Sequence, residues 1–158
     1  GESPELPVAP TIGYLGKGNL RERLADTLVG LGFTMSAIVS PDAVINEEVE
    51  VNEGTVVMDG VVVNSGSRVG KYVILNTRSS IDHDCEIGDF THIAPGVTLS
   101  GGVKVGEHSL VGAGATVVQY KNIGDHCIIG AGAVVAKDCL DPGTYVGVPA
   151  SKILQTRP

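Results

Sequence analysis

An aliphatic residue recurs at every sixth position over more than half of this chain, and this repeat constrains the fold more than any other feature. Starting at Val39 and stepping by six, seventeen consecutive positions through Val135 hold Val, Ile or Leu. Four residues after each lies a second series, mostly of small or β-branched residues, and the position after each aliphatic is mostly Gly, Asn, Ser or Asp. The repeat unit is therefore a short strand with one large and one small inward residue, followed by a turn.

Repeats of this kind predict a three-sided parallel β-helix. A corner every six residues gives three faces per coil, so residues eighteen apart stack as neighbours about 4.8 Å apart in parallel sheets. The composition agrees, because a chain with 22 Gly, no Trp and 4% aromatic residues must fill its core with aliphatic and small side chains. The inward small series includes Cys85, Cys127 and Cys139, which we interpret as core residues. Lys121 interrupts that series, which predicts a bulge in its coil.

The repeat divides the chain into three parts. Residues 1–38 precede it, residues 39–140 form the β-helix, and residues 141–158, where the period is lost, form a C-terminal cap. In the first part, "VAPTIGY" is a candidate strand, and the following segment predicts one helix with Asn19 as its N-cap. The apolar stripe of this helix is formed by Leu20, Leu24, Leu28 and Leu31.

Composition also narrows the partners and the compartment. The formal net charge of −7 argues against nucleic acid and against anionic membrane surfaces as partners. The sequence contains no apolar run long enough for a membrane span and no recognisable signal peptide. Three cysteines at unrelated spacings indicate free thiols, so we expect a cytoplasmic protein. The chain begins with Gly1 rather than Met, and we expect it to be a piece of a longer protein.

Two histidines in "SSIDHDCEIGDFTHIAPG" are the candidates for chemistry. Counting from the aliphatic positions predicts His83 in the middle of a face and His92 at a corner of the same coil. Nine residues is half a coil, so the two lie on opposite sides of the prism and can share a site only between subunits. A closed cyclic oligomer would bring them together. Gly101, one coil after His83, leaves room for a ligand beside the imidazole.

A second set of rings, eighteen residues apart, consists of Tyr72, Phe90, His108 and His126. His108 and His126 could form a metal pair, or all four rings could form a stacked ladder. We favour the ladder because no third metal ligand lies in this column.

The stretch "NTRSSIDHDCEIGDFTHIAPGVTLSGGVKVGEHSLVGAGATV", followed by "IIGAGAVV" and "VGVPASKIL", resembles the bacterial hexapeptide-repeat sugar acetyltransferases. The similar groups are the sialic acid O-acetyltransferases and the N-acetyltransferases of nucleotide-linked 4-amino sugars, and the resemblance covers roughly residues 12 to 158. It implies a left-handed β-helix, preceded by the last strand and helix of a small Rossmann-like substrate domain. It also implies a homotrimer that binds acetyl-CoA between adjacent prisms and needs no metal.

The resemblance further implies the role of each site residue. His83 matches the catalytic base, and Asp84 matches the acidic neighbour that orients the ring and raises its basicity. Imidazole suits this role, because it can take the proton of an amine or hydroxyl that attacks a thioester near neutral pH. The other implied residues are His92, Gly101, Ala113 and Ala131 for acetyl-CoA, and Gly13 and Asn76 for the sugar substrate.

We therefore expect an acetyl-CoA-dependent acetyltransferase that acts on the amino group of a UDP- or GDP-linked 4-amino-4,6-dideoxy sugar in bacterial surface-glycan biosynthesis. O-acetylation of sialic acid or a related sugar hydroxyl is the alternative within the family. Two other classes are less favoured. A γ-type carbonic anhydrase shares this prism but needs three well-placed histidines, and a non-catalytic trimeric scaffold would bind no acetyl-CoA.

Overall fold

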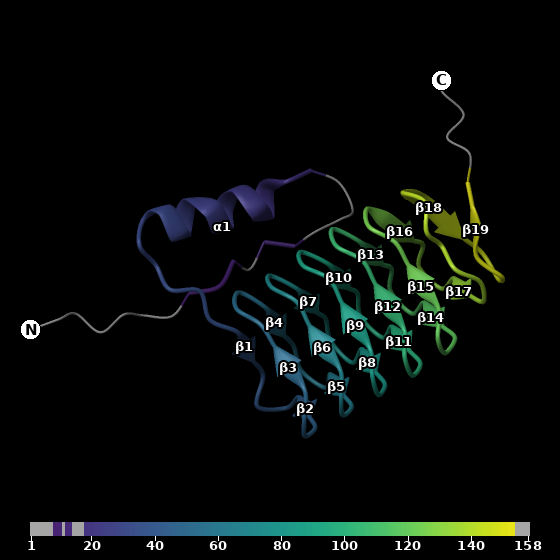
Figure 1. Cartoon of the computed structure of the whole chain (residues 1–158), viewed down its shortest axis with the longest axis horizontal. Helices are drawn as coiled ribbons and strands as arrows, with labels where there is room; N and C mark the ends of the chain where they lie inside the picture. Colours follow the sequence, from purple (N-terminus) through teal and green to yellow (C-terminus); the bar gives the residue numbers. More distant parts are fainter. Residues whose placement is uncertain (1–7, 11, 14–17, 154–158) are drawn as a thin grey trace, which may run out of the picture.

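The computed structural model describes residues 8–10, 12–13 and 18–153, and these form a solenoid of short parallel strands beside one helix (Figure 1). The chain visits three sheets in turn. The first sheet contains β1 (Ile38–Val39), β4 (Val56–Val57), β7 (Ile74–Leu75), β10 (His92–Ile93), β13 (Leu110–Val111), β16 (Cys127–Ile129), β18 (Gly143–Val146) and β19 (Ser151–Lys152). The second contains β2 (Val44–Ile45), β5 (Val62–Val63), β8 (Ser80–Ile81), β11 (Thr98–Leu99), β14 (Thr116–Val117) and β17 (Val134–Val135). The third contains β3 (Glu50–Val51), β6 (Arg68–Val69), β9 (Glu86–Ile87), β12 (Lys104–Val105) and β15 (Asn122–Ile123).

Successive coils stack in the register that the repeat predicts. His92 pairs with Leu110, and Leu99 pairs with Val117, so parallel neighbours are eighteen residues apart. The predicted three-sided parallel β-helix is confirmed. We call the turns from the first to the second sheet the first corner, those from the second to the third sheet the second corner, and those from the third to the first sheet the third corner.

The C-terminal end departs from this register. Cys127 pairs with Gly143, a spacing of sixteen residues, and β19 then runs antiparallel to β18. The last coil is thus shorter than the others, and the sheet ends in a hairpin rather than in another repeat.

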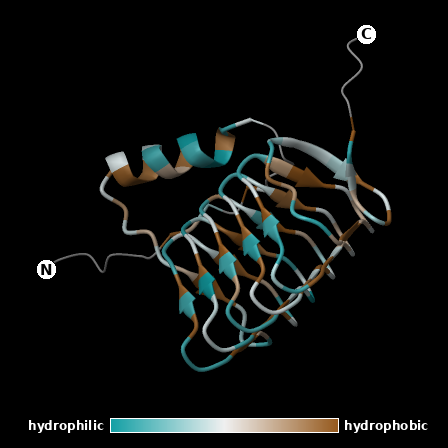
Figure 2. Cartoon of the chain, turned by 45° about the vertical axis from the view of Figure 1, so that its right-hand side comes forward, coloured by the Kyte–Doolittle hydropathy of each residue, from teal (hydrophilic) through white to brown (hydrophobic). Residues whose placement is uncertain are grey.

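The core is the column of aliphatic residues that the repeat identifies. From Val57 to Val135, every member of the six-residue series is at most 3% exposed, and the hydrophobic residues recur along the coils in Figure 2. Burying one such side chain contributes about 1.5–3 kcal/mol. Cys85, Cys127 and Cys139 are free and buried, as predicted, and burial raises the pKa of the Cys139 thiol to about 11.

Among the described residues, the buried Ser and Thr side chains of the small series keep a hydrogen bond, except Ser79, whose Oγ is buried without a partner. Thr55 Oγ1 donates to the Gly70 carbonyl at 2.8 Å and accepts from the Val73 amide at 3.0 Å. The coil of Lys121 also keeps its register, since the Lys104 amide donates to the Lys121 carbonyl at 3.0 Å. The predicted bulge is wrong because the stacking there uses only main-chain atoms, and a half-buried lysine can extend its amino group to solvent.

Helix α1 (Leu20–Gly30) begins directly after Asn19, whose side chain makes no capping hydrogen bond. Its buried residues are Arg21 and Ala25, whereas Leu20 is 60% exposed. The predicted leucine stripe is therefore correct only in part: Leu24 and Leu28 are half-buried, and Leu28 packs against the cluster of Ala25 and Tyr72, whereas Leu31 is exposed like Leu20. The most buried contacts of the helix are a small residue and a guanidinium, because the surface it meets is a β-helix corner that presents main-chain carbonyls. Among the described residues, no helix combines the length and apolar character that a membrane crossing requires.

The segment before the helix pairs with the segment that follows it. Val8 forms a parallel bridge with Met35, with its amide donating to the Thr34 carbonyl at 3.2 Å. Within the described residues of "VAPTIGY", the candidate strand is reduced to this bridge.

Candidate active site

His83 lies in the turn between β8 and β9, at the second corner, and His92 is the first residue of β10. The prediction of His83 in the middle of a face and His92 at a corner is therefore wrong, because His83 lies in a turn and His92 in a strand. Each strand ends at its large aliphatic residue, so the position two residues later is already in the turn, and the position five residues later starts the next strand. The two histidines nevertheless lie on opposite sides of the prism, because the first sheet faces the corner that holds His83.

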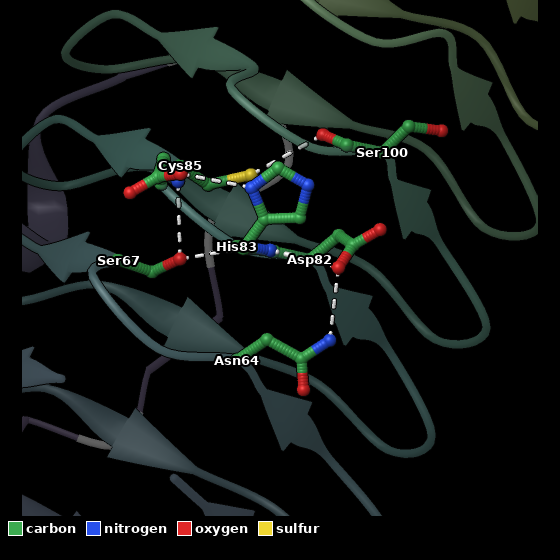
Figure 3. Close-up of polar contacts among 7 residues, drawn as sticks. Asn64, Ser67, Asp82, His83, Cys85 and Ser100 are labelled. Carbon is green, nitrogen blue, oxygen red and sulfur yellow. Dashed lines mark hydrogen bonds and ion pairs between the residues drawn. The ribbon is translucent and has the colours of Figure 1, made fainter. Parts of the chain in front are cut away.

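The turn of His83 is held by hydrogen bonds from the preceding coil (Figure 3). Ser67 Oγ donates to the Asp82 carbonyl at 2.7 Å and accepts from the Cys85 amide at 3.0 Å, which clamps both ends of the turn. Asp82 Oδ1 accepts from the His83 amide at 2.8 Å and from Asn64 Nδ2 at 2.9 Å. The hydrogen bond from Asn64, followed by that from the His83 amide, lowers the pKa of the Asp82 carboxyl. Asp82 is thus a turn residue with a fixed charge.

The His83 side chain is oriented by Asp84. Asp84 adopts a left-handed conformation with a φ of 57°, and its Oδ2 lies 2.8 Å from His83 Nδ1. Since an ionised carboxylate only accepts, Nδ1 carries the proton and Nε2 keeps its lone pair. This hydrogen bond is the main cause that raises the pKa of His83, and half of the imidazole is exposed. A basic nitrogen is thus presented at the second corner.

Two glycines make room for this pair. A Cβ atom on Gly101 would lie 2.6 Å from His83 Cε1, and one on Gly66 would lie 2.5 Å from Asp84 Oδ1. The space that Gly101 was predicted to leave beside the imidazole is therefore filled by the imidazole itself. Gly101 determines where Nε2 can lie.

Asn76 and His92 form a second pair on the first sheet. Asn76 Oδ1 accepts from the Thr77 amide at 2.8 Å, which turns Asn76 Nδ2 toward His92 Nε2 at 3.1 Å. His92 Nε2 must then be the acceptor, so its proton resides on Nδ1. The His92 side chain is only 8% exposed. This pair borders the first corner, where Asn76 directly precedes the turn.

Ala113 and Ala131 lie one coil apart in turns of this same first corner, and both are exposed. Each is followed by a glycine with a φ of +67°, and a Cβ atom on Gly114 or Gly132 would meet nothing within 4 Å. The part of the first corner around Ala113 and Ala131 therefore presents only small residues. Gly13 is exposed and lies in the segment before α1.

Within one chain, the predicted site residues thus fall into two groups on either side of the second sheet. The second corner holds His83, Asp84 and Gly101, and the first corner holds Asn76, Ala113 and Ala131, with His92 beside Asn76 on the first sheet. Gly13 belongs to neither group.

Two hollows accompany these features. One of about 600 Å³ at the first corner is lined by Asp42, Asp59, Thr77, Arg78, Pro95 and Gly96 among others, and Thr77 adjoins Asn76. The other, of about 580 Å³, lies over the third sheet, where Lys104 pairs with Glu86 at 2.9 Å and Arg68 with Glu50 at 3.6 Å. None of the predicted site residues is among its described lining, and its charges largely neutralise each other. The hollow beside Asn76 is the better candidate for a ligand.

The four rings of the third corner form the predicted ladder. The ring centroids of Tyr72 and Phe90 are 4.8 Å apart, and those of His108 and His126 are 5.1 Å apart with nearly parallel planes. Within the described ranges, no three His, Cys, Asp or Glu side chains gather in a way that could hold a metal ion.

Sequence reasoning did not identify the residues that support the site. Asn64 and Ser67 hold the turn of His83, and Arg21 anchors α1. Asn64 lies eighteen residues before Asp82, so the repeat itself would have placed it beneath the turn. Arg21 carries no such signal, because nothing in the repeat predicts which face of the helix docks.

A parallel β-helix of six-residue repeats is the fold of the bacterial hexapeptide transferases. The model of the bacterial transferase hexapeptide (six repeats) matches residues 84–119. A solved structure of a histidine-to-asparagine variant of perosamine N-acetyltransferase from Caulobacter crescentus, in complex with CoA and GDP-perosamine, is 38% identical. It has a TM-score of 0.86, and the match covers 89% of this chain and 67% of that one.

Two further relatives point in the same direction. The acetyltransferase domain of PglB from Neisseria gonorrhoeae, solved with acetyl coenzyme A, is 37% identical with a TM-score of 0.84, over 88% of this chain and 68% of that one. GDP-perosamine N-acetyltransferase of Escherichia coli O157:H7 is 28% identical over 105 residues, which are 66% of this chain. The chain spans about half of that curated relative, 48% of its length. The chain belongs to the bacterial hexapeptide-repeat sugar acetyltransferases.

Proposed function

We propose that this protein transfers the acetyl group of acetyl-CoA to the amino group of a nucleotide-linked 4-amino-4,6-dideoxy sugar. The observation that carries the proposal is the His83–Asp84 pair, in which Nδ1 is held at 2.8 Å by the carboxylate and Nε2 is left with its lone pair. The relatives solved with CoA and GDP-perosamine support this substrate class. An amine that attacks a thioester needs such a base and needs no Ser or Cys nucleophile.

In the proposed reaction, the His83–Asp84 pair transfers the proton. As the sugar nitrogen forms its bond to the acetyl carbon, His83 Nε2 takes the proton that this nitrogen loses. Asp84 stabilises the resulting imidazolium and keeps Nδ1 protonated. The imidazolium can return the proton to the CoA sulfur as the carbon–sulfur bond breaks, which restores the base for the next cycle.

The site is completed between subunits of a homotrimer. Outward residues of the second sheet are small and uncharged: Val44, Val62, Ser80, Thr98, Thr116 and Val134. The third sheet instead presents charged side chains, such as Glu86 and Lys104. If the second sheets face the three-fold axis, the second corner of one subunit meets the first corner of the next. His83 then lies across a cleft from Asn76 and His92.

The remaining predicted roles fit this assembly. Acetyl-CoA lies in the cleft along Gly101, Ala113 and Ala131, and the sugar nucleotide approaches from the side of Gly13 and Asn76. Residues 1–38 are part of a substrate-binding domain, residues 39–140 the acetyltransferase domain, and residues 141–158 its cap. Three free, buried thiols agree with a cytoplasmic location.

The experiment follows the release of CoA thiol from acetyl-CoA with GDP- and UDP-linked 4-amino-4,6-dideoxy sugars and with sialic acid. We expect turnover with an amino sugar and a loss of about 10²–10⁴-fold in His83→Ala, because general-base catalysis contributes that much. The matched control is His126→Ala, which removes an exposed histidine of the ring ladder and should leave the rate unchanged. Turnover of His83→Ala within about threefold of the unsubstituted protein would contradict the base assignment. Acetylation of sialic acid alone would replace the amino-sugar proposal with O-acetylation.

A further inference from the structure

Arg21 is a buried cation in the first turn of α1. Its side chain is only 4% exposed, although the rest of the helix surface is largely open to solvent. The guanidinium donates to three main-chain carbonyls, from Nη1 to Ile12 at 2.8 Å, from Nε to Tyr72 at 3.0 Å and from Nη2 to Gly54 at 3.5 Å. One side chain thus connects the segment before the helix to two coils of the β-helix.

Docking the helix through these hydrogen bonds costs free energy, because it removes a charged guanidinium from water. Burial lowers the pKa of Arg21 to about 10, so the group is still protonated at neutral pH and its charge is desolvated. All of the hydrogen bonds described for it go to carbonyls. An apolar side chain of similar size would dock the helix at a lower cost in free energy. What only arginine offers here is a planar fork of donors that holds several acceptors in one fixed arrangement.

The three carbonyls belong to two different parts of the molecule. Gly54 and Tyr72 lie one coil apart at the third corner, and Tyr72 packs with Ala25 in a small apolar cluster under the helix. Ile12 lies in the segment before the helix, directly next to Gly13. In Figure 1 this segment runs alongside the coils rather than within them. Arg21 is therefore a direct tie between the Ile12–Gly13 segment and the β-helix.

We propose that Arg21 is a positioning residue for the sugar-nucleotide acceptor. It holds the Ile12–Gly13 main chain at the distance from the β-helix that lets Gly13 contact the acceptor. This inference rests on the proposed function and adds to it a residue that touches neither substrate. Its loss should weaken acceptor use and spare acetyl-CoA, because the acetyl-CoA residues all lie on the β-helix itself.

The test compares Arg21→Met with Leu28→Ala. Arg21→Met keeps the apolar stem and removes all three hydrogen bonds, whereas Leu28→Ala loosens the same cluster and leaves those bonds intact. With GDP-perosamine as the probe, we expect Arg21→Met to raise KM for the acceptor at least tenfold while KM for acetyl-CoA stays within twofold. Arg21→Lys keeps the charge and some of the donors, so it should recover part of the loss. Leu28→Ala should lower Tm without changing either KM.

Hydrogen exchange of the peptide that covers Val8 to Gly13 gives a readout that does not depend on activity. Exchange there should be faster in Arg21→Met than in Leu28→Ala at equal loss of Tm. Equal exchange in both variants, or equal changes in acceptor KM, would overturn the positioning role and leave Arg21 as a structural anchor. Failure of the unsubstituted protein to acetylate any acceptor would overturn the proposed function instead, and the exchange result would still decide whether Arg21 holds the segment.

Discussion

At the scale of single residues, the basicity of His83 depends mainly on one neighbour. The hydrogen bond to Asp84 Oδ2, at 2.8 Å, raises the pKa of His83 above its ordinary value. A base works only when it is deprotonated, so activity should fall as the pH drops through this raised pKa. The same carboxylate fixes the tautomer that leaves Nε2 free.

We predict that Asp84→Asn changes the pH profile of kcat/KM in two ways. The acid limb should move to lower pH, because the pKa of His83 returns toward its ordinary value without the carboxylate. The maximum should fall by about 10- to 100-fold or more, since an amide cannot stabilise the imidazolium. Pre-steady-state or steady-state rates measured between pH 5 and pH 9 would show both effects. Glu86→Gln, which removes an exposed carboxylate from the third sheet, is the control. An unchanged acid limb in Asp84→Asn would mean that Asp84 does not tune the base.

At the scale of elements, the strands from β1 to β15 are each only two residues long, and the inward residue of each contributes most to stability. In β9, Ile87 is 3% exposed and lies in register between Val69 and Val105, while Glu86 points outward to Lys104. The aliphatic column is therefore one continuous core in which each member packs against the coil before and the coil after.

We predict that Ile87→Ala lowers the free energy of unfolding by about 2–5 kcal/mol, because it leaves a cavity between two coils. Glu86→Ala in the same strand should cost at most about 1 kcal/mol, the value of an exposed ion pair. Denaturant unfolding at one fixed protein concentration would measure both, since association of subunits in the proposed trimer would add to the measured stability. Similar losses in the two variants would contradict the assignment of the core.

At the scale of the whole molecule, one chain keeps the proposed site residues in two separate groups. His83 lies at the second corner, Asn76 lies at the first corner, and His92 lies beside Asn76 on the first sheet. A closed ring of subunits would join each group to the complementary group of a neighbour.

We predict that two inactive variants restore activity when their subunits are mixed. His83→Ala and His92→Ala, each strongly impaired alone, should after co-refolding form some sites with both histidines intact. Random assembly in equal amounts gives roughly a quarter of the sites this composition, and hence about a quarter of the full activity. Sedimentation should give three times the 16.2 kDa chain mass. A monomer in solution, or no recovered activity in the mixture, would contradict a site shared between subunits.

The six-residue repeat alone was sufficient to predict the β-helix, its eighteen-residue register and, from Val57 to Val135, its buried residues, whereas Val39 in the first coil is 44% exposed. This follows because each inward position from Val57 to Val135 is decided by its neighbours one coil away, so the local pattern and the tertiary contact carry the same information. For the same reason, the separation of His83 from His92 could be read from their spacing, while their placement within a coil depended on where two-residue strands end.

Only the tertiary structure decided the features for which the six-residue repeat makes no prediction. The docking face of α1 is one case, because the burial of Arg21 depends on carbonyls of Gly54 and Tyr72 that no helical pattern encodes, while Leu20 stays exposed. The contact between His83 and Gly101 is another, since stacking brings the two residues together but the side-chain direction decides which atoms meet. Periodic packing is determined locally by the sequence, whereas single hydrogen bonds between distant segments depend on the folded arrangement.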